Sequence, residues 1–408
     1  MGQVVIAAIA AIGQMALAQG AQFDLMLCPP PTRERLDDWA SLLRLTAEQR
    51  GVFDARVETT LQPLNDVWTR EFKDLETASA ELASGPGPYE DQSTIEAFEA
   101  MWRRRNRVAA QLAGIEGDLF VPWSDPPLLS AEQVEDLAVL GEARRRERTL
   151  AARCEIGAAQ VDLGLLLLDL VRESGGPFRG EDSLREAWRA YESELGALRD
   201  RRVTELVEAG LRDPRLYHQF PPDQMDEFVA ARTTLRRAFL RSEMLIVNRS
   251  RYWLDELTRS LEPATGDKLR RTYLAQAFPR VYPDPFDCTV LAGQIEADAE
   301  LPAGAKSDMR ALSAACGARL GEIGRLMEQA CVRYDEENAA AVTRSPTRTD
   351  GFERSLAELN RRRAACAAEF LAVADHELGD LSRWPAAGRL QEAVRNASLA
   401  QDGGAGSR

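Results

Sequence analysis

Hydrophobic residues recur along most of the chain with the period of an α-helix. In one clear stretch they occupy, in steps of three and four, Phe53, Val57, Leu61, Leu64, Trp68, Phe72 and Leu75. That spacing places the side chains on one face of a helix, which can then pack against a neighbour. Pro63 lies inside the stretch and is expected to kink or split it. No segment alternates as a half-buried strand would, so the pattern predicts an all-α fold.

A five-residue motif marks the points where new helical patterns begin. LTAEQ at 45–49 returns as LSAEQ at 129–133, and weaker copies stand at 220–224 (FPPDQ) and 301–305 (LPAGA). Thr or Ser before a helix accepts a hydrogen bond from the third helical NH, and Gln at that position can reach back to the cap. The residues expected to form the two capping boxes are Thr46, Gln49, Ser130 and Gln133.

A second series of helix-start signals lies between these motifs. Ser93 and Glu96 form the pattern S-x-x-E, and Ser183 and Glu186 repeat it 90 residues later. Each Ser is expected to cap a helix, with the Glu completing the capping box. Two interleaved series at similar offsets indicate internal repetition with a unit of roughly 80 to 90 residues.

The repetition predicts four diverged units, each a pair of long antiparallel helices joined by a loop rich in Gly and Pro. Helices of about 30 to 40 residues would be about 45 to 60 Å long. We expect an extended array or bundle of these hairpins. The predicted segments are a signal peptide (1–18), hairpin units at 32–122, 128–215, 220–282 and 301–383, a linker (283–300), and a C-terminal short helix with a disordered tail (384–408).

The start of the chain predicts export. Residues 1–18, MGQVVIAAIAAIGQMALA, form an apolar run that is short for a membrane span, and Ala16-Leu17-Ala18 fits a signal-peptide cleavage site. No Lys or Arg precedes Arg33, so the usual positive start of a signal is missing, and the alternative is a buried N-terminal helix. We expect a periplasmic or extracellular protein with no integral membrane segment in the mature chain.

Six cysteines stand at positions 28, 154, 288, 316, 331 and 366, and none forms the C-x-x-C pair of a zinc knuckle. One pairing has a geometric argument. A hairpin loop centred near residue 348 would bring Cys331 and Cys366 level with each other on facing helices. We expect either a disulfide between them or two buried free thiols.

The formal net charge of −14 repels phosphate backbones and argues against nucleic acid as a partner. Three arginine runs nevertheless suggest a surface for polyanions: WRRRNR (102–107), EARRRERT (142–149) and NRRRAA (360–365). The alternative is a solvated helix face on which each Arg pairs with an acidic residue one turn away, as Glu142 would with Arg146. We favour this alternative.

Residues with catalytic or metal-binding chemistry are sparse. Histidine occurs only at His218 and His376, which argues against a His-based triad or metal site. His376 and Asp380 stand one helical turn apart, as in a zincin helix, but no third ligand follows. GLLLLDLV at 164–171 is apolar on every side and predicts a buried helix. The sequence assigns no catalytic residue, metal ligand or cofactor, and we expect a protein that is not an enzyme.

The two pentapeptides resemble the LTxxQ motif of the Spy/CpxP-like exported helical proteins. The matching residues are Leu45, Thr46 and Gln49, then Leu129 and Gln133, with Ser130 in place of Thr. The resemblance implies export and helical hairpins, and the family includes ATP-independent chaperones and metal-stress sensors. This chain differs from the family in its length, its acidic charge and its lack of evident His and Met ligands.

Three functions remain open at this point. The first is a non-enzymatic exported repeat protein that binds protein or peptide partners, with chaperone-like holding of unfolded clients as one form. The second is a cell-envelope scaffold that self-associates through amphipathic faces. The third is a metal-stress sensor or an enzyme that would use carboxylates with His218 or His376.

Overall fold

The computed structural model describes residues 27–84, 92–121, 128–151, 154–174, 182–217, 219–220, 224–340 and 346–402. Within these ranges the chain forms α-helices and three short 3-10 helices but no strand, which confirms the predicted all-α class. The chain divides into two compact units: unit 1 comprises Met1–Tyr273 with Asn338–Thr343, and unit 2 comprises Leu274–Glu337 with Arg344–Arg408.

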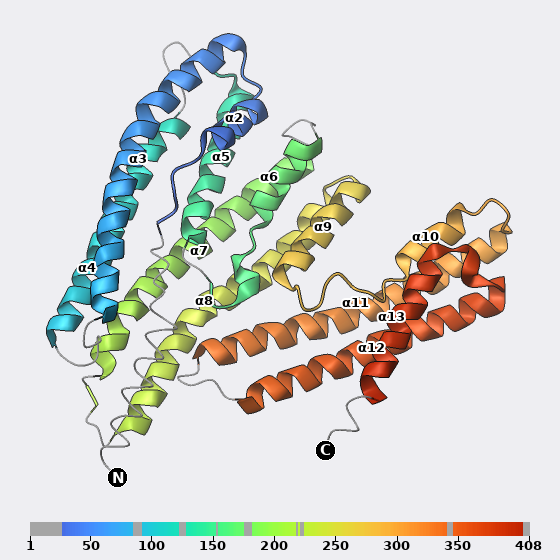
Figure 1. The fold of residues 1–408 in the computed structure, drawn as a ribbon. Coiled ribbons are helices and arrows are strands. Elements are labelled where there is room, and N and C mark those ends of the chain that lie inside the picture. The colour runs from blue at the N-terminus through green and yellow to red at the C-terminus, as the bar shows by residue number, and fades with distance from the viewer. Residues whose placement is uncertain are drawn as a thin grey trace. The chain divides into compact units, whose positions relative to one another are not determined.

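Unit 1 holds the helices of the first three predicted hairpin segments. Its elements are α2 (Arg33–Leu42), α3 (Ala47–Ser84), α4 (Gln92–Gly117), η1 (Asp118–Phe120), α5 (Ala131–Leu150), η2 (Gly157–Gln160), α6 (Leu163–Ser174), α7 (Asp182–Tyr217), α8 (Met225–Arg259) and most of α9 (Pro263–Ala277). α3 packs along α4, and α7 packs along both α5 and α8 (Figure 1). Helices from different predicted hairpins therefore share one packed unit.

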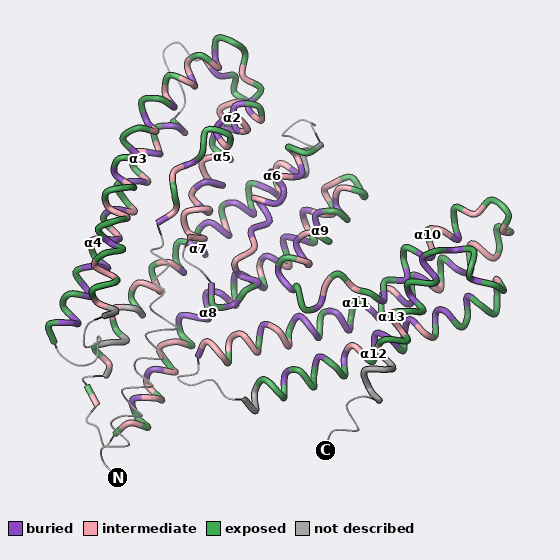
Figure 2. Tube along the Cα trace, in the orientation of Figure 1, coloured by how far each residue is buried: buried purple, intermediate pink, exposed green. Residues whose placement is uncertain are grey.

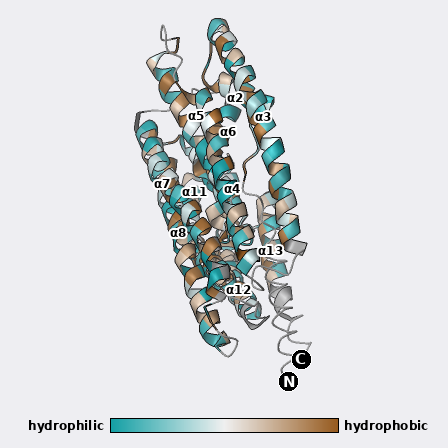
Figure 3. Cartoon of the chain, turned by 90° about the vertical axis from the view of Figure 1, so that its left-hand side faces the viewer, coloured by the Kyte–Doolittle hydropathy of each residue, from teal (hydrophilic) through white to brown (hydrophobic). Residues whose placement is uncertain are grey.

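The pairing of α3 with α4 follows from the periodicity of the sequence. Their shared core is apolar and includes Leu64, Val67, Leu75, Phe98, Met101, Trp102, Val108 and Leu112. α3 runs through Pro63 without a break, because a helix can continue past a proline if it gives up one backbone hydrogen bond. Figure 2 shows buried and exposed residues alternating around these helices, and Figure 3 shows the same alternation in hydropathy.

The second predicted hairpin differs from the structure in its first arm. Instead of one long helix, the chain forms α5, then the short η2, then α6. The break allows the apolar α6 to turn into the core, where Leu163 and Leu167 are fully buried. A helix that is hydrophobic on all sides needs neighbours on all sides, which a simple two-helix hairpin does not offer.

Unit 2 contains the fourth predicted hairpin and two smaller helices. Its elements, which follow the end of α9, are α10 (Thr289–Ala297), α11 (Ala303–Ala340), α12 (Pro346–Leu378), η3 (Leu381–Arg383) and α13 (Pro385–Asp402). The last residues of α11, from Asn338 on, belong to unit 1. α13 packs against α12 and α10. The core is apolar and includes Phe286, Leu291, Ile295, Met309, Leu320, Phe370, Trp384 and Leu390, together with Cys288, Cys316 and Cys366. α10 lies within the segment predicted as a linker.

Candidate functional site

Both strong copies of the LTAEQ motif begin helices as the sequence predicts. At α5, the Ser130 Oγ accepts from the Gln133 NH at 3.2 Å, and the Gln133 Oε1 accepts from the Ser130 NH at 2.9 Å. At α3, the same two hydrogen bonds join Thr46 and Gln49 at 3.3 and 2.9 Å. Each capping box satisfies two backbone NH groups that a helix start would otherwise leave without partners.

The two glutamines also bind each other, which no pattern in the sequence indicated. Gln49 Nε2 donates to Gln133 Oε1, and Gln133 Nε2 donates to Gln49 Oε1, both at 3.0 Å. Gln49 also donates to the Leu128 carbonyl at 2.6 Å, and Gln133 to the Leu43 carbonyl at 3.1 Å. We call Gln49 and Gln133, with these two carbonyls, the glutamine clasp. It ties the start of α3 to the start of α5, so both motif copies serve one contact.

The other two predicted caps are wrong in position. α4 begins at Gln92, so Ser93 lies inside the first turn, and Glu96 accepts from the Gln92 side chain (Nε2 to Oε1, 3.2 Å). α7 begins one residue before Ser183, and Glu186 is exposed. The pattern S-x-x-E fits the first turn as well as the cap, so it does not fix the helix start to the residue.

The run EARRRERT does not form the solvated helix face that its sequence favours. Three consecutive residues span about 200° of a helix surface, so on a helix that is packed on several sides, as α5 is, they do not all face solvent. Arg145 does pair along the helix with Glu142 at 3.2 Å. Arg144 and Arg146, however, are 5% and 0% exposed, and Arg146 turns away from Glu142 to bind residues of other elements.

Arg146 belongs to a buried cluster of charges between α5, α6 and α7. The Asp162 carboxylate accepts from Arg146 Nε at 3.0 Å, lies 3.2 Å from Arg199 Nε, and caps α6 by accepting from the Leu165 NH at 3.1 Å. Arg146 also donates to Glu192 (Nη2 to Oε1, 2.8 Å). Burial raises the pKa of Asp162, but the two arginines outweigh it and hold the pKa below its ordinary value. We call the four charged residues of this group the Asp162 cluster: Arg146, Asp162, Glu192 and Arg199.

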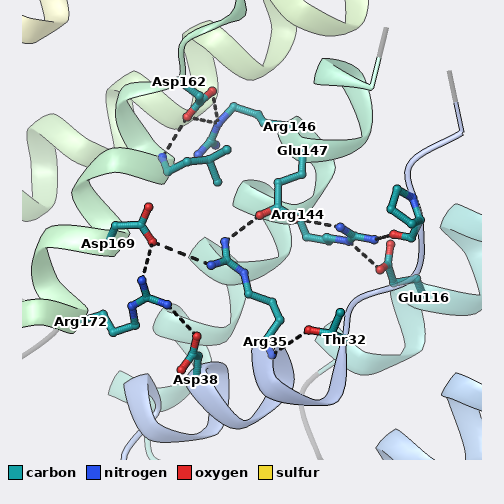
Figure 4. Close-up of polar contacts among 12 residues, drawn as sticks. Thr32, Arg35, Asp38, Glu116, Arg144, Arg146, Glu147, Asp162, Asp169 and Arg172 are labelled. Atoms are coloured by element: carbon teal, nitrogen blue, oxygen red, sulfur yellow. Dashed lines mark hydrogen bonds and ion pairs between the residues drawn. The ribbon is translucent and has the colours of Figure 1, made fainter. Parts of the chain in front are cut away.

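A second group of ion pairs joins α2, α4, α5 and α6 (Figure 4). Buried Glu116 accepts from Arg144 Nε at 2.7 Å, and Arg144 also donates to Glu147 at 2.8 Å. Arg35 reaches Glu147 at 2.7 Å and lies 3.9 Å from Asp169. These contacts connect helices that are distant in sequence, so the basic run on α5 acts as a junction in unit 1.

A cavity of about 290 Å³ lies between α4, α5 and α7. Its apolar lining consists of Leu27, Ala109, Leu112, Ala113 and Val203, and its polar lining of Cys28, Arg105, Arg145, Arg148, Thr149 and Asp200. Arg105 comes from the run WRRRNR on α4, and the other two arginines come from EARRRERT on α5. Two basic runs that stand apart in the sequence therefore converge at one cavity.

The cavity wall carries three cations and one carboxylate. Arg145 lies 3.4 Å from Asp200, and its buried Nε has no hydrogen-bond partner among the described residues. Burial lowers the pKa of Arg105 to about 10, so this side chain is still protonated at neutral pH. Burial raises the pKa of the Cys28 thiol, which keeps it protonated and weakly nucleophilic. This lining suits an apolar group that carries a negative charge.

Of the two outcomes left open for Cys331 and Cys366, the structure shows free thiols and no disulfide between them. Both cysteines are free, and Cys366 instead lies beside Cys316, with the sulfur atoms 3.4 Å apart. Cys331 stands nine residues before the end of α11 at Ala340, whereas Cys366 stands 20 residues after the start of α12 at Pro346. The hairpin turns earlier than residue 348, and this shift in register separates the predicted pair.

His376 and Asp380, the pair that resembled a zinc-binding helix, do not form a metal site. α12 ends at Leu378, before Gly379, whose positive φ of 76° turns the chain, so His376 and Asp380 do not share a helix face. Asp380 instead caps η3 by accepting from the Ser382 NH at 2.8 Å. Among the described residues no group of three or more His, Cys, Asp and Glu is arranged to hold a metal ion. His218 and the predicted signal peptide lie outside the described residues.

No helix in the described part of the chain is long and apolar enough to cross a membrane. Comparison of the chain with protein-family models, with curated proteins and with solved structures gave no match. The resemblance to the LTxxQ proteins therefore stays a prediction. The contact between Gln49 and Gln133 gives both residues a structural role that does not depend on membership of that family.

Proposed function

We propose that this protein is a non-enzymatic helical binding protein that takes an acidic, apolar segment of a protein or peptide into the cavity between α4, α5 and α7. The observation that carries the proposal is the convergence of three arginines from two basic runs on one apolar wall. We further propose, from the N-terminal pattern, that it acts after export to the periplasm or the extracellular space.

The dimensions and charge of the cavity support this choice of partner. A volume of about 290 Å³ is at the lower end for ligand sites, so it suits one or two apolar side chains and not a large cofactor. A carboxylate beside those side chains could accept from Arg145, whose Nε lacks a partner in the described part of the chain. A charge-assisted hydrogen bond in a partly dry site is stronger than one in water, which would fix the orientation of the segment.

The surroundings hold the walls of the cavity in place before a partner arrives. Arg148, at its edge, is ion-paired with Glu116, which also binds Arg144 at 2.7 Å. The Asp162 cluster fixes α5 against α7 a short distance along the same helices. Binding to walls that are already ordered costs less conformational entropy, so a small cavity can still give useful affinity.

Fluorescence anisotropy with two labelled peptides tests the proposal. The first peptide is Gly-Ser-Leu-Leu-Asp-Ser-Gly, and the second has Asn in place of Asp. We expect the Asp peptide to bind several-fold more tightly, because only its carboxylate can pair with Arg145. Arg145→Gln should abolish that preference, whereas Arg201→Gln should not, since Arg201 pairs with Glu205 at 2.7 Å outside the cavity. If neither peptide binds the wild-type protein, the proposal fails.

The chaperone form of the proposal has a separate test. A protein that holds unfolded clients should suppress the aggregation of a reduced, unfolding client at equal molar ratio and without ATP. Peptide binding without such suppression would leave a specific binding protein and remove the chaperone form. Light scattering across a wide concentration range addresses the scaffold alternative, which requires self-association.

A further inference from the structure

Three buried cysteines meet in the core of unit 2. The sulfur atoms of Cys288 and Cys316 are 3.1 Å apart, and those of Cys316 and Cys366 are 3.4 Å apart. Cys288 directly precedes α10, while Cys316 lies on α11 and Cys366 on α12. Cys316 is therefore the shared neighbour of two thiols that come from different elements, and the binding proposal for unit 1 gives this cluster no role.

The spacing of the sulfur atoms favours bond formation between them over metal binding. Thiolates around a tetrahedral zinc ion, at about 2.3 Å from the metal, are about 3.8 Å from one another. Both sulfur pairs here are closer than that. A disulfide bond of about 2.05 Å requires each pair to approach by only about 1 to 1.4 Å, which lies within the reach of side-chain rotation.

The electrostatics of the cluster single out Cys316 as the reactive thiol. The close contacts with the Cys288 and Cys366 thiols lower the pKa of Cys316 in spite of its burial, and the Arg319 guanidinium adds to this effect. Burial and the contact with Cys316 raise the pKa of Cys366. Cys316, which lies between the other two thiols, is therefore the one that ionises most readily.

We propose that Cys288, Cys316 and Cys366 form a thiol–disulfide exchange site, in which Cys316 makes one disulfide with either neighbour and the third cysteine remains a thiol. The Cys288 bond would tie the start of α10 to α11. The Cys366 bond would tie α11 to α12. Exchange between the two would change which elements of unit 2 are cross-linked.

The oxidant is a small or protein disulfide, and the step balances as an exchange. The Cys316 thiolate attacks one sulfur of the oxidant, forms a mixed disulfide and releases the first thiolate. The Cys288 or Cys366 sulfur then attacks Cys316 Sγ and releases the second thiolate. The two protons of the protein thiols end on the two released thiols. Because Cys316 is only 5% exposed, the first attack requires local opening of the core.

Thiol mapping of the full-length protein tests the proposal. The reduced protein is incubated with oxidised glutathione, the remaining thiols are alkylated, and the disulfide-linked peptides are identified by mass spectrometry. We expect one intramolecular disulfide that contains Cys316, with both the Cys288 and the Cys366 partners found. Cys366→Ala should leave only the Cys288–Cys316 bond, and Cys288→Ala only the Cys316–Cys366 bond.

Two controls separate proximity in the fold from general thiol reactivity. Cys331→Ala should leave the pattern unchanged, because Cys331 is outside the cluster. The same incubation in guanidinium chloride should remove the preference for Cys316. The proposal is overturned if all three cysteines are still alkylated after oxidation in the folded wild-type protein. It is also overturned if a Cys288–Cys366 disulfide forms equally well in a folded Cys316→Ala variant, as judged by circular dichroism.

Discussion

Unit 1 and unit 2 are both built from long amphipathic helices, but the residues buried in their cores differ in chemical type. Unit 1 buries a set of arginines, namely Arg105, Arg144, Arg146, Arg199, Arg202 and Arg232. In the described part of unit 2 the buried arginine is Arg363, which lies beside Asp284, and the core around it is apolar with three thiols at its centre.

The difference shows what each kind of core demands of the sequence. A buried guanidinium must meet a carboxylate or a carbonyl at a fixed place, because an unpaired buried charge is very costly. An apolar core accepts many arrangements of similar volume. Unit 1 should therefore respond sharply to small changes at single polar positions, and unit 2 should respond more gradually.

The largest effect should come from Asp162→Asn in unit 1. Loss of this charge leaves Arg199 and one side of Arg146 without their carboxylate in a fully buried site. We expect the free energy of unfolding to fall by about 3 to 5 kcal/mol in urea denaturation. The matched change in unit 2, Arg319→Gln, breaks an exposed pair with Glu369, so its effect on the free energy of unfolding should be small. Similar losses for the two variants would contradict the comparison.

The pH dependence of the free energy of unfolding tests the contribution of the Asp162 carboxylate in a second way. The pKa of Asp162 is lower in the folded protein than its ordinary value of 3.8. Its stabilisation is then complete above the unfolded-state pKa and is lost as the pH falls through the folded-state pKa. Below about pH 5 the wild-type protein should lose stability more steeply than Asp162→Asn. If the free energy of unfolding depended on pH in the same way in both proteins, Asp162 would not be the source of the acid-sensitive stability.

A middle-sized effect is expected from adding one methyl group at a glycine in each unit. A Cβ at Gly164 would lie 2.4 Å from Arg146 Nη2 and 2.9 Å from Glu192 Oε1, so Gly164→Ala would push the ion pair apart. We expect a loss of about 1 to 3 kcal/mol. In unit 2, the atom closest to a Cβ at Gly324 is the Tyr282 hydroxyl, at 2.8 Å; because this one side chain is only half-buried, Gly324→Ala should cost less.

Open glycines on the same kinds of helix provide the controls for this pair. A Cβ at Gly114 in unit 1 or at Gly321 in unit 2 meets no atom within 4 Å. Alanine at these two helical positions should stabilise the protein by up to about 1 kcal/mol. If Gly164→Ala behaved like Gly114→Ala in thermal denaturation, the Asp162 cluster would have more room than its geometry shows.

Among the destabilising changes proposed for unit 1, those in the glutamine clasp should have the smallest effect. Gln49→Ala and Gln133→Ala each remove one cap hydrogen bond and the shared amide contacts, and each should cost about 1 to 2 kcal/mol. The double variant should cost less than the sum, because the second change has no partner left to lose. A double-mutant cycle measures this coupling, and strict additivity would show that the clasp contributes nothing beyond the two caps.

Much of the architecture was accessible from the sequence because helices are specified locally. The steps of three and four from Phe53 predicted α3, and Thr46 and Ser130 stand at its start and at the start of α5. Local chemistry alone is enough for such predictions, since a cap and its third residue are neighbours in the chain. The same local logic failed by two residues at Ser93: a cap there would start the helix at Thr94, but α4 begins at Gln92.

The candidate cavity could have been suspected only in part. A run of three arginines spans about 200° of a helix, so on a helix that is packed on several sides at least one of them turns inward, and this geometric signal is present in both WRRRNR and EARRRERT. That signal does not say that Arg105 and Arg145 line the same cavity. The arginine run also does not indicate that Arg146 pairs with Asp162 and not with Glu142, although Glu142 is one helical turn away.

The sequence by itself determined the all-α class, the principal helix starts and the long amphipathic faces, because each depends on residues within a few positions of one another. Only the tertiary structure decided which helices pair, which arginines are buried and which cysteines meet. These depend on the register between distant helices: a hairpin that turns a few residues earlier places Cys316, and not Cys331, beside Cys366. Such a shift leaves every local pattern unchanged while it replaces the long-range contacts.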